Sequence, residues 1–334
     1  MEGLNTAVLF LVFNRPDHTT KVFETIRLAK PKQLFIAADG PRSDRPEENG
    51  ICREVRKIAS NVDWDCEVKT LFRETNLGCG LAVSEAITWF FEHVEEGIIL
   101  EDDCVCDPSF FKYCEVLLEK YKQNPLIMHI GGNNFQDGIQ RGDADYYFSK
   151  YNHIWGWATW RRAWLAYDIK MRGYDKHGIS SKVKKISSNP QFADYWINIF
   201  EKCFHEEPVT WDFQWTYAIW NNEGLATLPR VNLVSNIGFD EDGTHTTVQE
   251  SWLSNLKKEA LTLKTHPDVI RVDQEADSFT SEKVFGINKN NYSLVFNVKK
   301  AKTIFFHIRV ILSALVPEKL KSYYKRYKYK IAGK

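Results

Sequence analysis

Short apolar runs that alternate with helical patterns constrain the fold of this chain most strongly. The apolar runs cover 7–13, 34–38 and 97–100, and the helical patterns cover 17–30, 49–60 and 80–95. Strands that are apolar on both faces and are joined by amphipathic helices are typical of a parallel sheet covered on both sides. We therefore predict an α/β fold with a mostly parallel sheet flanked by helices.

Polar clusters follow each of the three apolar runs. They are Asn14-Arg15 after the first, Asp39-Gly40 after the second, and Glu101-Asp102-Asp103 after the third. Ligands of open α/β sheets bind beyond the carboxyl ends of the strands. If the strands are parallel, these clusters meet at one edge of the sheet and form a candidate site there.

The acidic cluster Glu101-Asp102-Asp103 is the sharpest chemical signal. Neighbouring carboxylates repel one another, so such a cluster needs a cation or hydrogen-bond donors to neutralise it. A solvated acidic turn is the alternative, but the position after a buried strand favours a hard divalent ion, Mn²⁺ or Mg²⁺, bridged to phosphates.

The other clusters are less specific. Arg15 and Asn14 lie where a strand passes into a helix, a place that suits an anion or a planar base edge, although a simple helix start remains an alternative. Asp39 can accept a hydrogen bond from a base N–H, or belong to a routine turn. The glycine-rich segment 76–80 could approach a phosphate, but a helix entry without a ligand explains it equally well.

The segment 126–245 is rich in tryptophan. Eight of the 11 tryptophans fall between 155 and 220, and most of them are expected in the core. Trp157 nevertheless lies in a pattern that suits a sugar-binding cleft. Asp212, just before a predicted helix, is a candidate general base or a helix N-cap. His245, at the end of the polar loop 236–245, is a candidate for contact with a metal or diphosphate, or a surface residue.

Charge divides the chain into an acidic body and a basic tail. Residues 299–334 hold 11 basic residues and one acidic residue, whereas the whole chain holds 44 of each. The acidic body argues against nucleic-acid binding. Basic and aromatic residues that alternate in the tail predict an amphipathic helix on an anionic membrane surface, with RNA binding or a disordered tail as alternatives.

The seven cysteines contain no CxxC pair and indicate reduced thiols.

The order of these motifs resembles the nucleotide-sugar glycosyltransferases of the GT-A fold, over roughly residues 5–245. It is most similar to the N-acetylglucosaminyltransferase I type and related bacterial enzymes. The motifs are FNRPDHT, ADGPR, NLGCG, GIILEDD, WGWATW, WD before a helix, and SNIGFDEDGTH. The resemblance implies a GT-A-like, Rossmann-type α/β fold with a mixed, mostly parallel sheet flanked by helices. It also implies a catalytic domain over 1–245, with a nucleotide-binding half at about 1–125 and an acceptor half at 126–245. We predict an extension at 246–298, with a helix at 249–261, and the membrane-associating tail at 299–334.

The resemblance also implies roles for the site residues. Arg15 and Asp39, with Asn14 nearby, would hold the base; Glu101 and Asp102 would contact ribose and donor sugar; and Asp103 would bind the metal. Asp212 would deprotonate the acceptor hydroxyl. The expected reaction is an inverting transfer from a UDP-sugar donor to a glycan or lipid-linked glycan acceptor, at the cytoplasmic face of a bacterial membrane, in surface polysaccharide synthesis.

Two alternatives remain open. A sugar-1-phosphate nucleotidyltransferase would share the sheet and the need for a metal, but is expected to carry a glycine-rich basic loop after its first strand, where FNRPDHT has no glycine. A non-catalytic, membrane-associated glycan-binding protein would explain the tryptophans and the tail, but not the acidic residues together.

Overall fold

The computed structural model describes residues 3–239, 252–254 and 256–287, and their centre is one eight-stranded sheet. The strand order across it is β3-β2-β1-β4-β8-β6-β9-β7. The bounds of these strands are β1 Val8–Val12, β2 Gln33–Ala38, β3 Glu67–Phe72, β4 Glu96–Glu101, β6 Ile127–Gly131, β7 Tyr146–Ser149, β8 Trp157–Trp160 and β9 Leu225–Pro229. A separate antiparallel pair joins β5 (Cys104–Cys106) to β10 (Val234–Asn236).

The first four strands of the sheet are parallel to one another. β1 pairs with β2 on one side and with β4 on the other, and Val12 lies opposite Ala38 at the end of the β1–β2 pair. Side chains on a strand point alternately to its two faces. Accordingly Val8 and Phe10 enter one core cluster, whereas Leu9 enters the cluster on the opposite face. This double burial explains why the apolar runs in the sequence do not alternate with polar residues.

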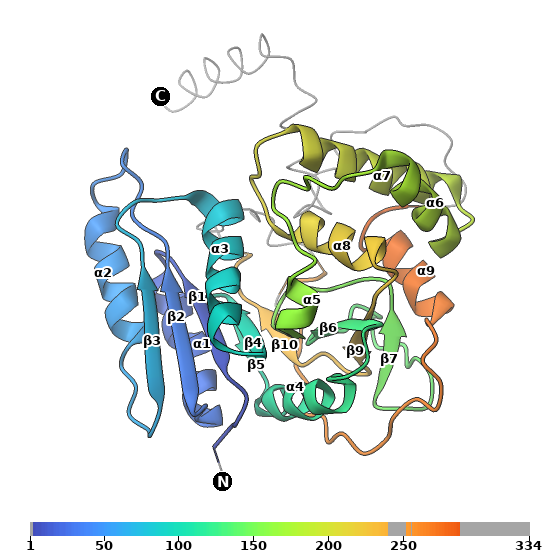
Figure 1. Cartoon of the computed structure of the whole chain (residues 1–334). Coiled ribbons are helices and arrows are strands. Elements are labelled where there is room, and N and C mark those ends of the chain that lie inside the picture. The colour runs from blue at the N-terminus through green and yellow to red at the C-terminus, as the bar shows by residue number, and fades with distance from the viewer. Residues whose placement is uncertain (1–2, 240–251, 255, 288–334) are drawn as a thin grey trace, which may run out of the picture.

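Helices cover both faces of the sheet (Figure 1). The core on one face includes buried side chains from α1 (Pro16–Ala29), α2 (Glu48–Ala59) and α4 (Pro108–Tyr121). The core on the other face includes side chains from α3 (Gly78–His93), α5 (Arg161–Trp164), α6 (Lys176–Ile186), α7 (Pro190–His205) and α8 (Asp212–Asn221). α9 (Gln274–Lys283) lies beside the edge strand β7.

The predicted α/β class is confirmed, and so are the helices at 17–30, 49–60 and 80–95, within about two residues. The sequence analysis missed β3, whose pattern is largely polar because it lies at the sheet edge. It also missed β8, which enters antiparallel between β4 and β6. The helix predicted at 249–261 is wrong over 256–261, where the backbone is irregular.

The predicted domain divisions are not tested by these observations, although the sheet continues across residue 125. The tail at 299–334 and His245 lie outside the described residues. Within the described part of the chain, no helix is both long enough and apolar enough to cross a bilayer.

Candidate functional site

Arg15 joins the carboxyl ends of β1 and β4. Its Nη2 donates to Asp102 Oδ1 in a short contact and to Asp103 Oδ2 at 3.1 Å. Burial lowers the pKa of Arg15, but the two carboxylates outweigh this effect and raise it above its usual value. The predicted meeting of the first and third polar clusters at one edge of the sheet is therefore confirmed.

Asp102 and Asp103 differ in exposure although they are neighbours. The side chain of Asp102 is 5% exposed and that of Asp103 is 16% exposed. Asp102 is thus buried against Arg15, whereas part of the Asp103 side chain reaches solvent. Of the two, Asp103 is the better placed to reach a ligand from solvent.

Negative charge exceeds positive charge at this place. Burial raises the pKa of Glu101 well above its usual value, and the neighbouring Asp103, Asp102 and Asp212 raise it further against the opposing effect of Arg15. Burial likewise raises the pKa of Asp102, although Arg15 lowers it. A bound cation would relieve this excess of carboxylate charge.

A loop after β10 lies over the Arg15–Asp103 pair. The backbone N–H of Ile237 donates to the carbonyl oxygen of Asp103 at 2.9 Å. A Cβ built on Gly238 would lie 2.4 Å from Asp103 Oδ2 and 2.9 Å from Arg15 Nη1. Only glycine allows this close approach without displacing the two charged side chains.

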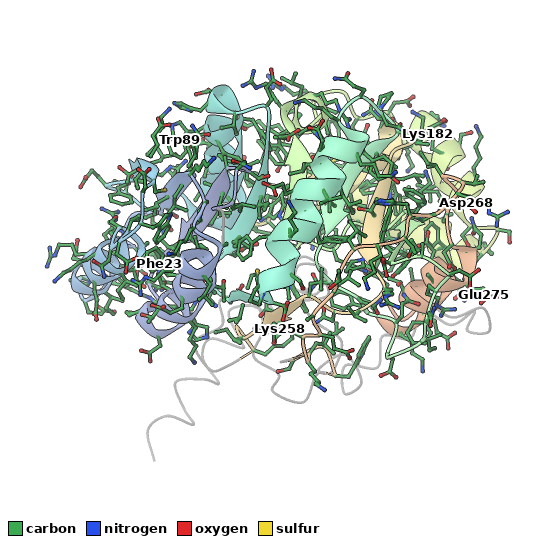
Figure 2. All side chains as sticks on the ribbon, turned by 90° about the horizontal axis from the view of Figure 1, so that it is seen from below. Phe23, Trp89, Lys182, Lys258, Asp268 and Glu275 are labelled. Carbon is green, nitrogen blue, oxygen red and sulfur yellow. The ribbon has the colours of Figure 1, made fainter. Side chains whose placement is uncertain are left out.

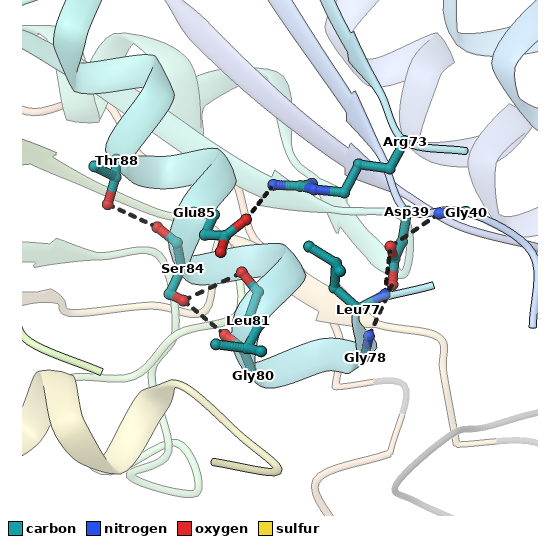
Figure 3. Close-up of polar contacts among 10 residues, drawn as sticks. All are labelled: Asp39, Gly40, Arg73, Leu77, Gly78, Gly80, Leu81, Ser84, Glu85 and Thr88. Carbon is teal, nitrogen blue, oxygen red and sulfur yellow. Dashed lines mark hydrogen bonds and ion pairs between the residues drawn. The ribbon is translucent and has the colours of Figure 1, made fainter. Parts of the chain in front are cut away.

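Asp39, at the end of β2, holds the start of α3 (Figure 3). Its carboxylate accepts the backbone N–H of Leu77 at 3.0 Å and 3.1 Å and that of Gly78 at 3.1 Å. The N–H of Gly40 and the amide of Asn76 also donate to it, each at 2.9 Å. Asp39 thus acts as a helix cap contributed by another strand, and the N–H groups of Leu77 and Gly78 are engaged with a carboxylate rather than open to a phosphate.

Asp212 lies close to the same site although it is far away in the sequence. A Cβ on Gly80 would lie 2.5 Å from the carbonyl oxygen of Pro208, so the start of α3 packs against the loop that leads to Asp212. Burial raises the pKa of Cys79 well above its usual value, and Glu101, Asp212, Asp103 and Asp39 raise it further. Cys79 is therefore near carboxylates from three separate segments of the chain. Asp212 itself is buried, accepts a short hydrogen bond from Thr210, and is the first residue of α8.

Glu48 organises the part of the site beyond Asn14. It is 3% exposed and accepts the side-chain amide of Asn14 at 3.2 Å and the backbone N–H and Nε of Arg42 at 3.0 and 2.8 Å. The Arg42 guanidinium in turn lies 5.5 Å from the centre of the Phe13 ring. The sequence analysis missed Glu48, because nothing local distinguishes it from the other acidic residues near the start of a helix.

Trp157 is not at the surface of a sugar-binding cleft. It is fully buried in the core, where its ring lies 5.0 Å from that of His129 and 5.5 Å from that of Trp211. Its place on β8, between two neighbouring strands, leaves no face of the indole for a ligand. The expected contact of Trp157 with a nucleotide-sugar is therefore corrected to a packing role.

A divalent cation fits this site only with help from a ligand. Among the described residues, no group of three His, Cys, Asp or Glu side chains could hold a metal ion. Mg²⁺ is commonly bound through one or two carboxylates together with substrate phosphates and water. Asp103 and the surplus of negative charge around it suit that arrangement, with the phosphates supplying the remaining oxygens.

The chain is similar to several solved structures, at low sequence identity and low TM-score. No protein-family model matches the chain, and no curated protein is similar to it. Solved structures with the same type of fold include a UDP-glucose pyrophosphorylase complexed with UDP-glucose, at 11% identity, with 48% of this chain and 78% of that chain covered and a TM-score of 0.29. Another is an inositol-1-phosphate CTP transferase from T. maritima, at 7% identity, with 69% and 86% covered and a TM-score of 0.36. A third is a 4-diphosphocytidyl-2C-methyl-D-erythritol synthase from Anaerococcus prevotii, at 10% identity, with 48% and 74% covered and a TM-score of 0.30.

These likenesses have TM-scores of 0.29–0.36 and concern the fold alone. They contradict the glycosyltransferase function expected from the sequence, because the solved structures are nucleotidyltransferases and related enzymes. They agree better with the alternative, a sugar-1-phosphate nucleotidyltransferase. The motifs that led to the first expectation indicate a fold, and a fold does not by itself determine the reaction.

Proposed function

We propose that the chain is a nucleotidyltransferase that joins a nucleotide to a phosphorylated sugar with the help of a divalent cation. The observation that carries the proposal is the cluster of Arg15, Asp102 and Asp103 at the carboxyl ends of two parallel strands. The Arg15 guanidinium is suited to bind phosphates, and the carboxylates beside it are suited to bind the metal ion that the phosphates share.

The phosphates are expected at the start of α1 rather than at the start of α3. Arg15 is the N-cap residue of α1 and its side chain makes no capping hydrogen bond there, whereas Asp39 caps α3. A helix N-terminus without an anion attracts phosphate. Both carboxylate contacts of Arg15 use Nη2, and a guanidinium has further N–H donors to offer a phosphate. This arrangement would take the place of the glycine-rich loop that the sequence lacks.

In the proposed reaction, an oxygen of the sugar phosphate attacks the α-phosphorus of a nucleoside triphosphate. The bond from that phosphorus to the β-phosphate oxygen breaks, and pyrophosphate leaves. A cation bound by Asp103 and the phosphates would neutralise the charge that develops on the leaving group. Arg15 would orient the phosphates, and Asp39 would keep the rim of the site in place through α3.

Asp212 receives a different proposed role from the one expected at first. A phosphate nucleophile is already ionised at neutral pH and needs no general base. A buried carboxylate beside the start of α3 is instead suited to bind sugar hydroxyls, and Asn14 and Arg42, which Glu48 holds, are suited to the base.

The test is an assay of pyrophosphate release by the purified chain. UTP, CTP, ATP and GTP are each incubated with glucose 1-phosphate, galactose 1-phosphate or mannose 1-phosphate, with and without Mg²⁺. We expect Mg²⁺-dependent release with at least one pair, lost in Asp103→Asn and retained in Asp143→Asn, a matched change at an exposed position. No release with any pair, together with no binding of any of the triphosphates by calorimetry, would reject the proposal.

A further inference from the structure

The ends of β1 and β2 lie where the base of a bound nucleotide is expected. β4, β1 and β2 are neighbours in the sheet, so the ends of β4 and β2 are two strand spacings apart, or about 10 Å. A nucleotide whose phosphates lie at Arg15 is long enough to bring its base to the end of β2. Figure 2 shows Phe23 on α1 and Trp89 on α3 at one end of the molecule and Glu275 on α9 at the other. β1 and β2 lie at the first of these ends (Figure 1).

Asn14 and Arg42 are oriented there by the same buried carboxylate. Asn14 Nδ2 donates to Glu48 Oε1 at 3.2 Å, Arg42 Nε donates to the same oxygen at 2.8 Å, and Arg42 Nη2 makes a short contact with it. A carboxylate only accepts hydrogen bonds, so the Asn14 amide has its nitrogen toward Glu48 and its oxygen away from it. Arg42 keeps Nη1 as a donor that no described residue engages. Its guanidinium is also held over the Phe13 ring, 5.5 Å from the ring centre.

Asn76, just before α3, is oriented in the same way by two other acceptors. Its Nδ2 donates to Asp39 Oδ2 and to the carbonyl oxygen of Gly40, each at 2.9 Å. The Oδ1 atom therefore points away from both. Within the described part of the chain, the Oδ1 atoms of Asn14 and Asn76 accept no hydrogen bond, and neither belongs to the side-chain atoms that are fully buried without a partner. Both oxygens are accessible acceptors.

We propose that this site selects guanine, an inference that rests on the nucleotide site proposed above. The groups on offer are two acceptors, the Oδ1 atoms of Asn14 and Asn76, and one cationic donor, Nη1 of Arg42. Guanine carries N–H donors on N1 and N2, which suit the two acceptors. It also carries the acceptors O6 and N7, which are the usual partners of arginine.

The other bases fit these groups less well. Uracil, which the resemblance implied, has one N–H between two carbonyl oxygens, so one asparagine oxygen would face a carbonyl oxygen. Adenine is usually bound by an asparagine that donates to N7, but the side-chain nitrogens of Asn14 and Asn76 are already engaged. Cytosine usually donates from N4 to a carboxylate, but Asp39 and Glu48 are buried and already accept several hydrogen bonds.

Calorimetry on the full chain tests this proposal, with GTP, UTP, CTP, ATP and inosine triphosphate as probes, each in the presence of Mg²⁺. We expect GTP to bind about tenfold or more tightly than UTP, CTP or ATP. Inosine triphosphate lacks only the amino group on N2, and is expected to bind about fivefold more weakly than GTP, for the loss of one hydrogen bond. The proposal is overturned if UTP, CTP or ATP binds as tightly as GTP, or if inosine triphosphate does.

Asn14→Ala and Asn76→Ala test the two acceptors. Each change is expected to lower the ratio of GTP affinity to UTP affinity about fivefold. Asn198→Ala is the matched control, because Asn198 is an exposed asparagine on α7, and it is expected to leave the ratio unchanged. A change that only disturbs the fold would weaken both nucleotides alike. An unchanged ratio in both Asn14→Ala and Asn76→Ala therefore also overturns the proposal.

These outcomes separate the choice of base from the reaction. A preference for GTP without pyrophosphate release from any sugar 1-phosphate supports the guanine site and rejects the proposed reaction. Pyrophosphate release without a preference for GTP supports the reaction and rejects the guanine site. Failure of all five nucleotides to bind rejects both.

Discussion

Asp39 and Asp103 have different roles at this site, one structural and one open to a ligand. Asp39 is turned into the protein, where its carboxylate accepts hydrogen bonds from Gly40, Asn76, Leu77 and Gly78. Asp103 is partly exposed and shares one arginine with Asp102. The first residue holds the site together, and the second is available to a ligand, so their substitutions are expected to affect different measurements.

Asp39→Asn tests the capping role. An asparagine amide would place an N–H group against backbone N–H donors. In the original chain these donors stabilise the Asp39 carboxylate, because they lower its pKa against the effect of burial, which raises it. We expect a loss of about 1–2 kcal/mol in the free energy of unfolding, as for a lost helix cap. Urea denaturation measures this, with Asp143→Asn as the exposed control. An unchanged midpoint would show that the cap contributes nothing.

Asp103→Asn tests the metal-binding role. The change keeps the size of the side chain but removes the charge that a divalent ion needs, while Asp102 still pairs with Arg15. We expect nucleotide affinity in the presence of Mg²⁺ to fall about tenfold or more, with a thermal midpoint close to that of the original chain. Calorimetry with and without Mg²⁺ measures the first quantity. Equal Mg²⁺-dependent binding by both proteins would remove Asp103 from the metal site.

At the scale of elements, the site depends on how closely β2 approaches the loop before α3. A Cβ on Gly40 would lie 2.4–2.6 Å from backbone atoms of Thr75. The two segments can therefore pack this closely only because residue 40 has no side chain. The helix α3 then continues from this contact, with its first N–H groups on Asp39. The strand end and the helix start therefore form one unit.

Gly40→Ala is expected to break this unit. The added methyl group overlaps backbone that cannot rotate away, and we expect about 2 kcal/mol or more of destabilisation together with weaker nucleotide binding. Gly50→Ala is the matched control, since a Cβ at Gly50 in α2 meets nothing within 4 Å. Alanine is expected to stabilise that helix by about 0.5–1 kcal/mol. Chemical denaturation of both variants gives the comparison, and equal effects would contradict the predicted contact.

At the scale of the whole molecule, the tryptophan-rich segments fill the core between the sheet and α5–α8. His129 lies inside this core, where Trp215 Nε1 donates to its Nδ1 at 3.3 Å and its Nε2 lies 2.9 Å from the carbonyl oxygen of His153. Burial lowers the pKa of His129 to about 3. The ring is therefore neutral and bridges β6 to α8 and to the segment before β8.

This histidine predicts how the stability of the whole molecule depends on pH. Its pKa in the folded state lies below the unfolded value of about 6.5, so the unfolded state binds the proton first as the pH falls. The contribution of His129 to stability is complete above about pH 6.5 and is lost progressively toward about pH 3.

Unfolding free energies measured by urea denaturation from pH 7 to pH 4 test this for the original chain and for His129→Gln. We expect the original chain to lose stability more steeply, by up to about 1.4 kcal/mol per pH unit. Parallel curves for the two proteins would show that His129 does not titrate in this way.

The sequence by itself determined most of the first half of the fold and the edge of the sheet where the polar clusters meet. β1, β2 and β4 are buried on both faces, so their apolar runs and the helices between them have a strong sequence pattern. Arg15, Asp102 and Asp103 come directly after two of these strands, so the same pattern predicts that they lie close together. The edge strand β3 and the inserted strand β8 lack such a pattern, because their environments come from neighbours distant in the sequence.

Only the tertiary structure decided what several single residues do. In the folded chain, Asp39 accepts hydrogen bonds from the start of α3, and Trp157 is buried in the core. Glu48 binds Asn14 and Arg42, and Asp212 lies near Cys79. A residue's type fixes which contacts it is able to make. Burial and the direction of its side chain, which are set by packing across the chain, determine which of those contacts it makes.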